Sequence, residues 1–124
     1  MPGVFFVAVG GAIGSVTRYL VGGWIAARFG SGFPYGTLAI NITASFIIGF
    51  FLAFAQDRVG FNPYWRLFVA VGFIGGYSTF STFEYEGMRL LLEREIMLGL
   101  VYVVGSVVAG GLAAVAGIAA GSWV

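Results

Sequence analysis

The chain has 124 residues, of which 60% are hydrophobic and 9% charged, and its mean hydropathy is +0.99. Soluble domains carry about 25% charged residues, so this composition indicates an integral membrane protein and excludes an ordinary soluble domain. The net charge is +1 with no basic run, which gives no support to nucleic acid as a partner. Cysteine and histidine are absent, so the sequence offers no disulfide, thiolate metal site or histidine base.

A spanning helix needs about 20 apolar residues, so four of them fill the chain as a single transmembrane domain, 1–124. The expected helices are approximately 4–28, 35–56, 64–93 and 96–120. The first hydrophobic run starts almost at Met1 without a charged segment before it, and we interpret it as a retained helix rather than a signal peptide. The predicted fold class is an all-α membrane protein.

The first helix combines small residues with a charge. Gly10 and Gly14 are four residues apart, as are Gly11 and Ser15, and such pairs let another backbone approach closely. Arg18 lies well inside the hydrophobic run. A charge at the centre of a membrane helix costs about 2.5–3.5 kcal/mol, so it either reaches the interface or faces protein or water. Arg18 is therefore an interfacial arginine or a fixed positive charge at the mouth of an aqueous vestibule.

The second helix carries one polar face. Thr37, Asn41 and Ser45 recur at intervals of four residues, which places them on one side of the helix. The Asn41 amide supplies two donors and an acceptor oxygen. An interhelical hydrogen bond, worth about 0.6 kcal/mol on average in membranes, is one interpretation, and a donor to a polar pathway is the other.

The third hydrophobic run contains the segment Gly75–Glu84, which reads GGYSTFSTFE where a membrane helix is normally most apolar. Each glycine weakens a helix by about 1 kcal/mol relative to alanine, and the hydroxyls offer the backbone other hydrogen-bond partners. We expect this helix to be broken near Gly75–Thr79. Non-helical backbone at membrane depth is tolerated only where it is buried in protein or lines a polar cavity, so this stretch is the best candidate for a site.

Two further groups of polar residues follow the expected break. Glu84 and Glu86 are typical of the interfacial end of a span, although Glu86 is one turn from Phe83 and is a candidate for a response to pH. In the fourth helix, Tyr102 and Ser106 form the polar face. The predicted packing face of this helix consists of Gly105, Ala109, Gly110 and Ala113.

The arginines leave the orientation in the membrane undecided. Arg58 and Arg66 fall on one side of the membrane, Arg28, Arg89 and Arg94 fall on the other, and lysine is absent. The positive-inside rule needs a clear excess on one side to fix an orientation. A chain without that excess can insert in both directions and form an antiparallel homodimer. Four short helices are also too few to enclose a protected pathway comfortably.

Hydrogen-bond donors dominate the polar side chains within the spans. Phenylalanine adds ring edges that are partly positive, so a pathway lined by both kinds of group suits a small anion. By composition and spacing alone, ordinary packing remains the stronger interpretation of Phe80 and Phe83. The candidate donors are Arg18, Thr37, Asn41, Ser81, Thr82, Tyr102 and Ser106.

Three motifs resemble the signature of the Fluc (CrcB) family of fluoride channels, in the right order and spacing. They are GGYSTFSTF from Gly75 to Phe83, GGxxGxxxRY from Gly10 to Tyr19, and GTLxxN from Gly36 to Asn41. Together they cover essentially the whole chain. One departure is Ser78, where the family commonly has threonine.

The resemblance implies a passive fluoride channel in the inner membrane of a prokaryotic cell. It implies a multi-pass, dual-topology, antiparallel homodimer with two pores, each lined by Phe80 and Phe83. Backbone carbonyls of Gly75 and Ser78 would hold a structural sodium ion on the dimer axis, and oxygen ligands freed at a helix break suit such a hard cation. The remaining residues implied along the ion pathway are Arg18, Thr37, Asn41 as a donor to the ion, Ser81, Thr82, Glu86, Tyr102 and Ser106.

Three other functions have less support in the sequence. A small dual-topology four-helix cation or multidrug exporter needs a membrane-embedded carboxylate, and the candidates are only Glu84 and Glu86, toward the end of a helix. A non-transporting assembly subunit fits the glycine-rich faces but does not explain the aligned donors. An enzyme is not expected, because the sequence has no histidine, cysteine or paired-carboxylate constellation.

Overall fold

The computed structural model describes residues 2–56, 58 and 60–124. All regular structure in these ranges is helical, which confirms the predicted all-α class. The elements are α1 (Pro2–Phe29), α2 (Tyr35–Gln56), α3 (Pro63–Arg66), η1 (Leu67–Ile74), α4 (Gly75–Tyr77), α5 (Ser81–Leu92) and α6 (Ile96–Trp123). The elements α3, η1 and α4 follow one another without interruption, and η1 has the wider π-helical turn.

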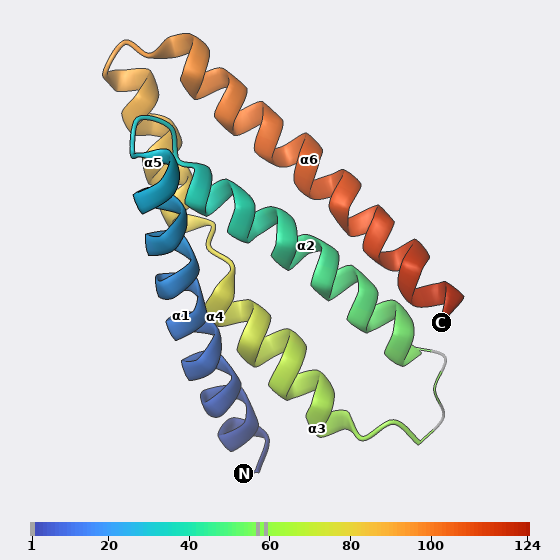
Figure 1. Ribbon diagram of the computed structural model, residues 1–124. Coiled ribbons are helices and arrows are strands. Elements are labelled where there is room, and N and C mark those ends of the chain that lie inside the picture. The colour runs from blue at the N-terminus through green and yellow to red at the C-terminus, as the bar shows by residue number, and fades with distance from the viewer. Residues whose placement is uncertain (1, 57, 59) are drawn as a thin grey trace.

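Helix α2 occupies the middle of the molecule (Figure 1). Helix α6 runs along one side of α2, and α1 with the segment from α3 to α4 lies on the other side. Both termini lie toward the end of the molecule that carries the connection from α2 to α3. The α1–α2 and α5–α6 connections lie at the opposite end.

In the part of the chain that the structure describes, three helices are long and apolar enough to cross a bilayer: α1, α2 and α6, with mean hydropathies of 1.7, 2.1 and 2.2 in their most apolar parts. The predicted third helix consists of two shorter pieces, 63–77 and α5, separated at residues 78–80. The predicted break near Gly75–Thr79 is therefore only partly right. Gly75 and Gly76 are helical, and the backbone leaves the helix at Ser78, whose ψ is 160°.

The end of α4 is fixed by hydrogen bonds rather than by the glycine pair. Both the amide and the hydroxyl of Ser78 donate to the carbonyl of Ile74, over 2.9 and 2.7 Å. Gly76 has a separate reason to be glycine, since a Cβ there would lie 2.5 Å from the carbonyl oxygen of Gly11 in α1. Gly76 thus permits α4 to pack on α1, and the Ser78 hydroxyl donates a hydrogen bond to the last turn of the helix.

The small residues of α1 pack as predicted. A Cβ on Gly10 would collide with the carbonyl oxygen of Phe68, and a Cβ on Gly14 with that of Phe73. From the other side, a Cβ on Gly72 would lie 2.9 Å from the carbonyl oxygen of Val7. The backbones of α1 and η1 are therefore in direct contact, which is how small residues associate helices in membranes.

Helices α2 and α6 also meet through glycine, chiefly at positions beyond those predicted in α6, although a Cβ on the predicted Gly110 would lie 3.5 Å from the Oγ of Ser45. Cβ atoms on Gly117 and Gly121 would collide with carbonyl oxygens of α2, and one on Gly49 would lie 2.6 Å from that of Ala114. Gly105 has no atom within 4 Å of the position of a Cβ. The prediction that Gly105 belongs to the packing face is wrong, because α6 carries small residues around much of its circumference.

The α5–α6 connection ends α5 with a left-handed residue. Arg94 has a φ of 65°, the amide of Glu95 donates to Leu90 over 2.9 Å, and that of Arg94 donates to Leu91 over 3.3 Å. This is the Schellman arrangement, in which glycine is the usual left-handed residue. The arginine there brings α6 back along α2.

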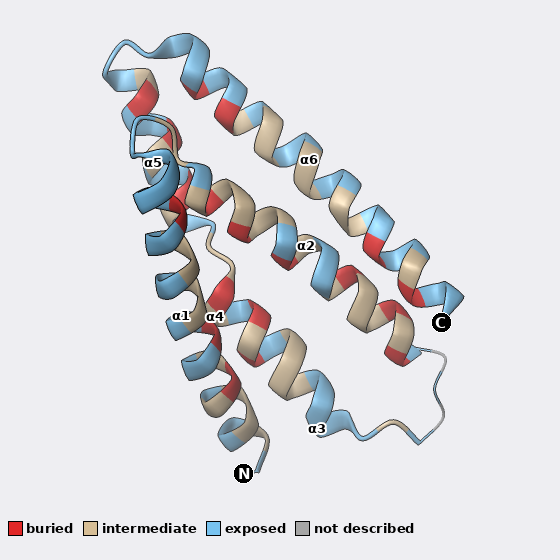
Figure 2. Ribbon diagram, in the orientation of Figure 1, coloured by how far each residue is buried: buried red, intermediate tan, exposed pale blue. Residues whose placement is uncertain are grey.

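Buried residues gather where the helices face one another, and the outward sides of α1 and α6 are exposed (Figure 2). The exposed side chains of α6 are mainly large and apolar. Such a surface suits the hydrocarbon of a bilayer or a second membrane-embedded chain and is not compatible with water. Examples in α6 are Val104, Val107, Val108, Leu112 and Val115.

The contact between α1 and η1 predicts a position-specific response to alanine. Gly14→Ala is expected to destabilise the protein by about 1–3 kcal/mol, the usual cost of overpacking, because its Cβ meets the backbone of Phe73. The measurement is the thermal unfolding midpoint in detergent. Gly23→Ala in the same helix is the control, since nothing lies within 4 Å of a Cβ there. Equal midpoints for the two variants would contradict the tight contact.

Candidate functional site

A side chain of α2 holds the break between α4 and α5. The Nδ2 of Asn41 donates to the carbonyl of Thr79 over 2.9 Å, and its Oδ1 accepts from the amide of Thr79 over 3.0 Å. One asparagine thus satisfies both backbone groups of the central residue of the break. Unsatisfied groups in a membrane interior cost several kcal/mol, so this pair of bonds allows the chain to leave the helix at this depth.

The break releases carbonyl oxygens. In a continuous helix the amide of Thr79 would donate to Gly75 and that of Thr82 to Ser78, but Thr79 donates to Asn41 and Thr82 donates to the hydroxyl of Thr79 over 3.2 Å. Within the described residues, the carbonyls of Gly75 and Ser78 therefore have no backbone hydrogen bond from the chain. Carbonyl oxygens without an internal donor are chemically suited to a hard cation such as sodium.

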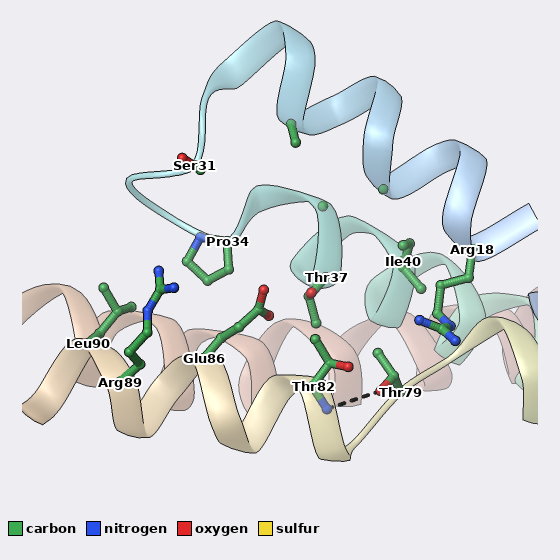
Figure 3. A pocket seen from close by; sticks show the side chains of 13 residues that line it. Arg18, Ser31, Pro34, Thr37, Ile40, Thr79, Thr82, Glu86, Arg89 and Leu90 are labelled. Atoms are coloured by element: carbon green, nitrogen blue, oxygen red, sulfur yellow. Dashed lines mark hydrogen bonds between the residues drawn. The ribbon is translucent and has the colours of Figure 1, made fainter.

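A cavity of about 310 Å³ opens beside the break (Figure 3). It lies among α1, α2 and α5, and at about 30 Å³ per molecule its volume corresponds to roughly ten waters. The space is far larger than a monatomic ion and suits a hydrated vestibule. Its polar lining consists of Arg18, Ser31, Thr37, Thr79, Thr82, Glu86 and Arg89.

The charges of the cavity lining favour an anion. The Nε of the half-buried Arg18 donates to the carbonyl of Gly76 over 3.2 Å, which leaves its other N–H groups for the cavity. The Nε of Arg89 lies 3.7 Å from the Oε2 of Glu93. Both side chains are exposed, so this ion pair contributes little to stability. The cavity lining thus carries two positive guanidinium groups, those of Arg18 and Arg89, and one carboxylate, that of Glu86.

Glu86 connects the cavity to α6. Its Oε1 accepts a hydrogen bond from the hydroxyl of Tyr102 over 3.2 Å, and Tyr102 has no solvent-exposed surface. The polar side of α5 thus continues into the buried contact between α5 and α6.

Aromatic rings extend from Tyr102 toward the surface. The rings of Tyr102 and Phe83 are 5.3 Å apart, those of Phe83 and Phe80 are 5.9 Å apart, and Phe33 meets Tyr102 edge-on at 5.5 Å. Phe83 is 7% exposed, whereas Phe80 is 72% exposed. The row therefore starts in the interior and ends on a side chain that this single chain leaves uncovered.

Ser106 lies one turn beyond Tyr102 in α6. Its Oγ is buried, and among the described residues it has no hydrogen-bond partner. A buried hydroxyl without a partner costs about 1–3 kcal/mol. One turn from Tyr102, α6 thus carries a buried hydroxyl that the described residues leave unpaired.

Seven of the predicted site residues fall into two groups. Arg18, Thr37, Thr82 and Glu86 share the cavity lining, and Phe80, Phe83 and Tyr102 form the aromatic row. Ser81 and Gly75 are exposed, beside the break. Asn41 contacts the backbone of Thr79 rather than lining the cavity, and its role toward an ion stays a prediction, as do the roles of the others.

Besides Ser31, which lines the cavity from the α1–α2 connection, three residues of the site were not predicted. Thr79 was inside the expected break, but its backbone bonds to Asn41 and the hydroxyl that accepts from Thr82 were not anticipated. Arg89 is three residues after Glu86, a spacing that could have placed both on one helical face. Phe33 lies in the α1–α2 connection, where no periodic pattern indicates its contact with Tyr102.

Residues 5–118 match the protein family described as "CrcB-like protein, Camphor Resistance (CrcB)". The chain belongs to the CrcB family. This membership covers almost the whole chain, including the break, the cavity and the aromatic row. With its apolar helices, the chain is a multi-pass membrane protein.

Several bacterial relatives in this family carry the name "Fluoride-specific ion channel FluC". The chain is 46% identical to the relative from Rhizobium meliloti (strain 1021) over 119 residues, which is 96% of this chain and 95% of the relative. It is 44% identical to the relative from Acidobacterium capsulatum over 117 residues, 94% of each chain. It is 45% identical to the relative from Aquifex aeolicus (strain VF5) over 107 residues, 86% of each chain.

The geometry at the break predicts the effect of removing Asn41. Asn41→Ala leaves the amide and carbonyl of Thr79 without their partner, and each unsatisfied group costs about 1–3 kcal/mol. A clear fall in the thermal unfolding midpoint in detergent is expected. Ser45→Ala, one turn further on the same face, is the control and should change the midpoint little. A fall of the same size in both variants would refute the bridging role.

Proposed function

We propose that this protein is a fluoride-specific channel that lets fluoride leave the cell passively across the inner membrane. The observation that carries the proposal is the arginine- and hydroxyl-lined cavity beside a broken membrane helix, in a chain 46% identical to a protein named as a fluoride-specific channel. Such passive movement needs no carboxylate that exchanges protons. The pathway must attract the anion and replace its hydration shell with donors.

Entry of the anion begins in the cavity. Arg18 and Arg89 raise the local concentration of anions, because a cleft lined by one sign of charge focuses the field. Hydroxyls of Thr37 and Thr82 donate to the ion as it loses water. Asn41 uses one N–H on Thr79 and retains a second that can donate to the ion.

Beyond the cavity the ion passes aromatic edges and hydroxyls. The positive ring edges of Phe80 and Phe83 attract an anion more weakly than a charge would, so they do not trap it. Ser106 has a buried hydroxyl without an internal partner, and the anion supplies that partner. The hydroxyls of Ser81 and Tyr102 complete this polar side, and Glu86 holds Tyr102 in place through its hydrogen bond.

The functional unit is an antiparallel homodimer of dual topology with two pores. The near-even division of arginines supports insertion in both directions. The large exposure of Phe80, next to the break, supports a second chain that covers it. An inverted partner places its own break against this one and encloses each pathway between two chains.

A structural sodium ion lies on the two-fold axis of this dimer. The carbonyls of Gly75 and Ser78 would hold it, and their lack of backbone donors among the described residues fits this role. The ion supplies a fixed positive charge that offsets part of the cost of desolvating anions nearby.

The alternative of a cation or multidrug exporter has less support. A proton-coupled exporter needs a carboxylate that is free to exchange its proton for a cation. Glu86 accepts a hydrogen bond from Tyr102 and lies in a cavity with two arginines, which repel cations. Relatives that match across almost the whole chain are named as channels.

Ion release from liposomes tests the proposed function. The purified protein is reconstituted in vesicles loaded with fluoride or chloride, and release is followed with ion-selective electrodes. Fluoride is expected to leave rapidly and chloride to remain. Equal release of the two anions, or no fluoride release, would refute the proposal.

The aromatic row predicts a selective loss of conduction. Phe80→Ile or Phe83→Ile is expected to reduce fluoride release at least about tenfold, because the aliphatic side chain has no positive edge. Size-exclusion chromatography should still show the dimer. Phe5→Ile, at an exposed position of α1, is the control and should conduct like the original chain. Unchanged release in both pathway variants would assign these rings to packing alone.

A further inference from the structure

Tyr77 is the last residue of α4, directly before the break, and its side chain reaches α2. It is 6% exposed, and its hydroxyl lies 2.8 Å from the Oγ1 of Thr43. Its ring packs among Ile40, Ala44 and Ile74. Apart from Ile40, which also lines the cavity, these residues lie outside the cavity and the aromatic row, so the pathway described above does not account for the Tyr77–Thr43 contact.

The direction of the Tyr77–Thr43 hydrogen bond follows from the number of protons. The Oγ1 of Thr43 lies 2.8 Å from the carbonyl oxygen of Ala39 and 3.0 Å from that of Ile40. Neither carbonyl can donate, so the single hydroxyl proton of Thr43 is directed to them. The Tyr77 hydroxyl is therefore the donor to Thr43.

The Tyr77 side chain is fixed along its whole length. Its ring stacks on Phe73 with centroids 5.6 Å apart and an angle of 17°, while the hydroxyl is held on α2. Its backbone lies between Gly75 and Ser78, and among the described residues the carbonyls of both lack backbone donors. Any rotation of the end of α4 would change the direction of both carbonyls.

We propose that Tyr77 and Thr43 are positioning residues that orient the carbonyls of Gly75 and Ser78 for the cation. This inference rests on the sodium site of the proposed function. Asn41 fixes the break after Ser78 by binding Thr79, and Thr43 fixes it before Ser78 by binding Tyr77. Ligands held in place before binding lose less freedom when the cation arrives, so this two-sided attachment strengthens binding.

Sodium-dependent thermal stability tests the inference without reference to conduction. The unfolding midpoint of the purified protein in detergent is measured as sodium chloride replaces N-methylglucamine chloride at constant ionic strength. A bound cation raises the midpoint with concentration, and the concentration for half the effect reports affinity. Tyr77→Phe and Thr43→Val are each expected to raise that concentration about three- to tenfold, as expected for one lost hydrogen bond.

Matched variants separate positioning from general stability. Thr43→Ser keeps the acceptor hydroxyl and should retain the sodium dependence of the original chain. Tyr85→Phe removes an exposed tyrosine hydroxyl, and Thr17→Val removes a hydroxyl that bonds only within α1, to Ile13 over 2.7 Å. Neither control should shift the sodium concentration for half the effect.

Each outcome decides a different point. A lower midpoint in Tyr77→Phe and Thr43→Val with unchanged sodium dependence would make the bond purely structural and overturn the inference. If Tyr77→Phe does not fold, Thr43→Val and Thr43→Ser still decide it. An original chain that sodium does not stabilise would overturn both the sodium site and the positioning role. Fluoride release from liposomes, measured separately, decides the channel function itself.

Discussion

The pair of hydrogen bonds between Asn41 and Thr79 is the interaction on which the site depends. A bilayer supplies no water to a broken helix, so a membrane helix can open only where other groups satisfy its backbone. Here one amide side chain binds both backbone groups of Thr79. Because the Thr79 amide is diverted, the carbonyl of Gly75 loses its helical donor. The hydrogen bond from the Thr79 amide to Asn41 thus stabilises the break and also leaves the carbonyl of Gly75 without its helical donor.

Helix α1 supports the same break from the other side. Gly10 and Gly14 bring its backbone against η1, and Gly76 brings the backbone of α4 against Gly11. At this distance the side chain of Arg18 reaches the carbonyl of Gly76. The position of Arg18 therefore depends on the close glycine contacts between α1 and the segment η1–α4. A larger residue between the helices would move the charge away from the cavity as well as destabilise the fold.

Hydropathy was sufficient to predict the helices, and three motifs were sufficient to predict the family. The break was placed too early because the glycines of Gly75-Gly76 were taken as its cause, whereas the backbone leaves the helix at Ser78 and Asn41 binds the residue that follows. The polar face of α2 was visible, but periodicity does not identify the partner of an amide. In α6, small residues occur on several sides of the helix. Periodicity therefore did not identify Gly117 and Gly121 as the residues that contact α2.

The number of free carbonyls connects the break to the proposed dimer. Hard cations of the calcium or magnesium type take about six oxygen ligands, and two carbonyls from one chain leave most such positions open. A two-fold axis at the break would double the contribution without any new residue. For an axis in the membrane plane, the two chains must insert in opposite directions. The near-even arginine distribution permits this, so the proposed dimer would explain the weak orientation signal and would also complete the proposed cation site.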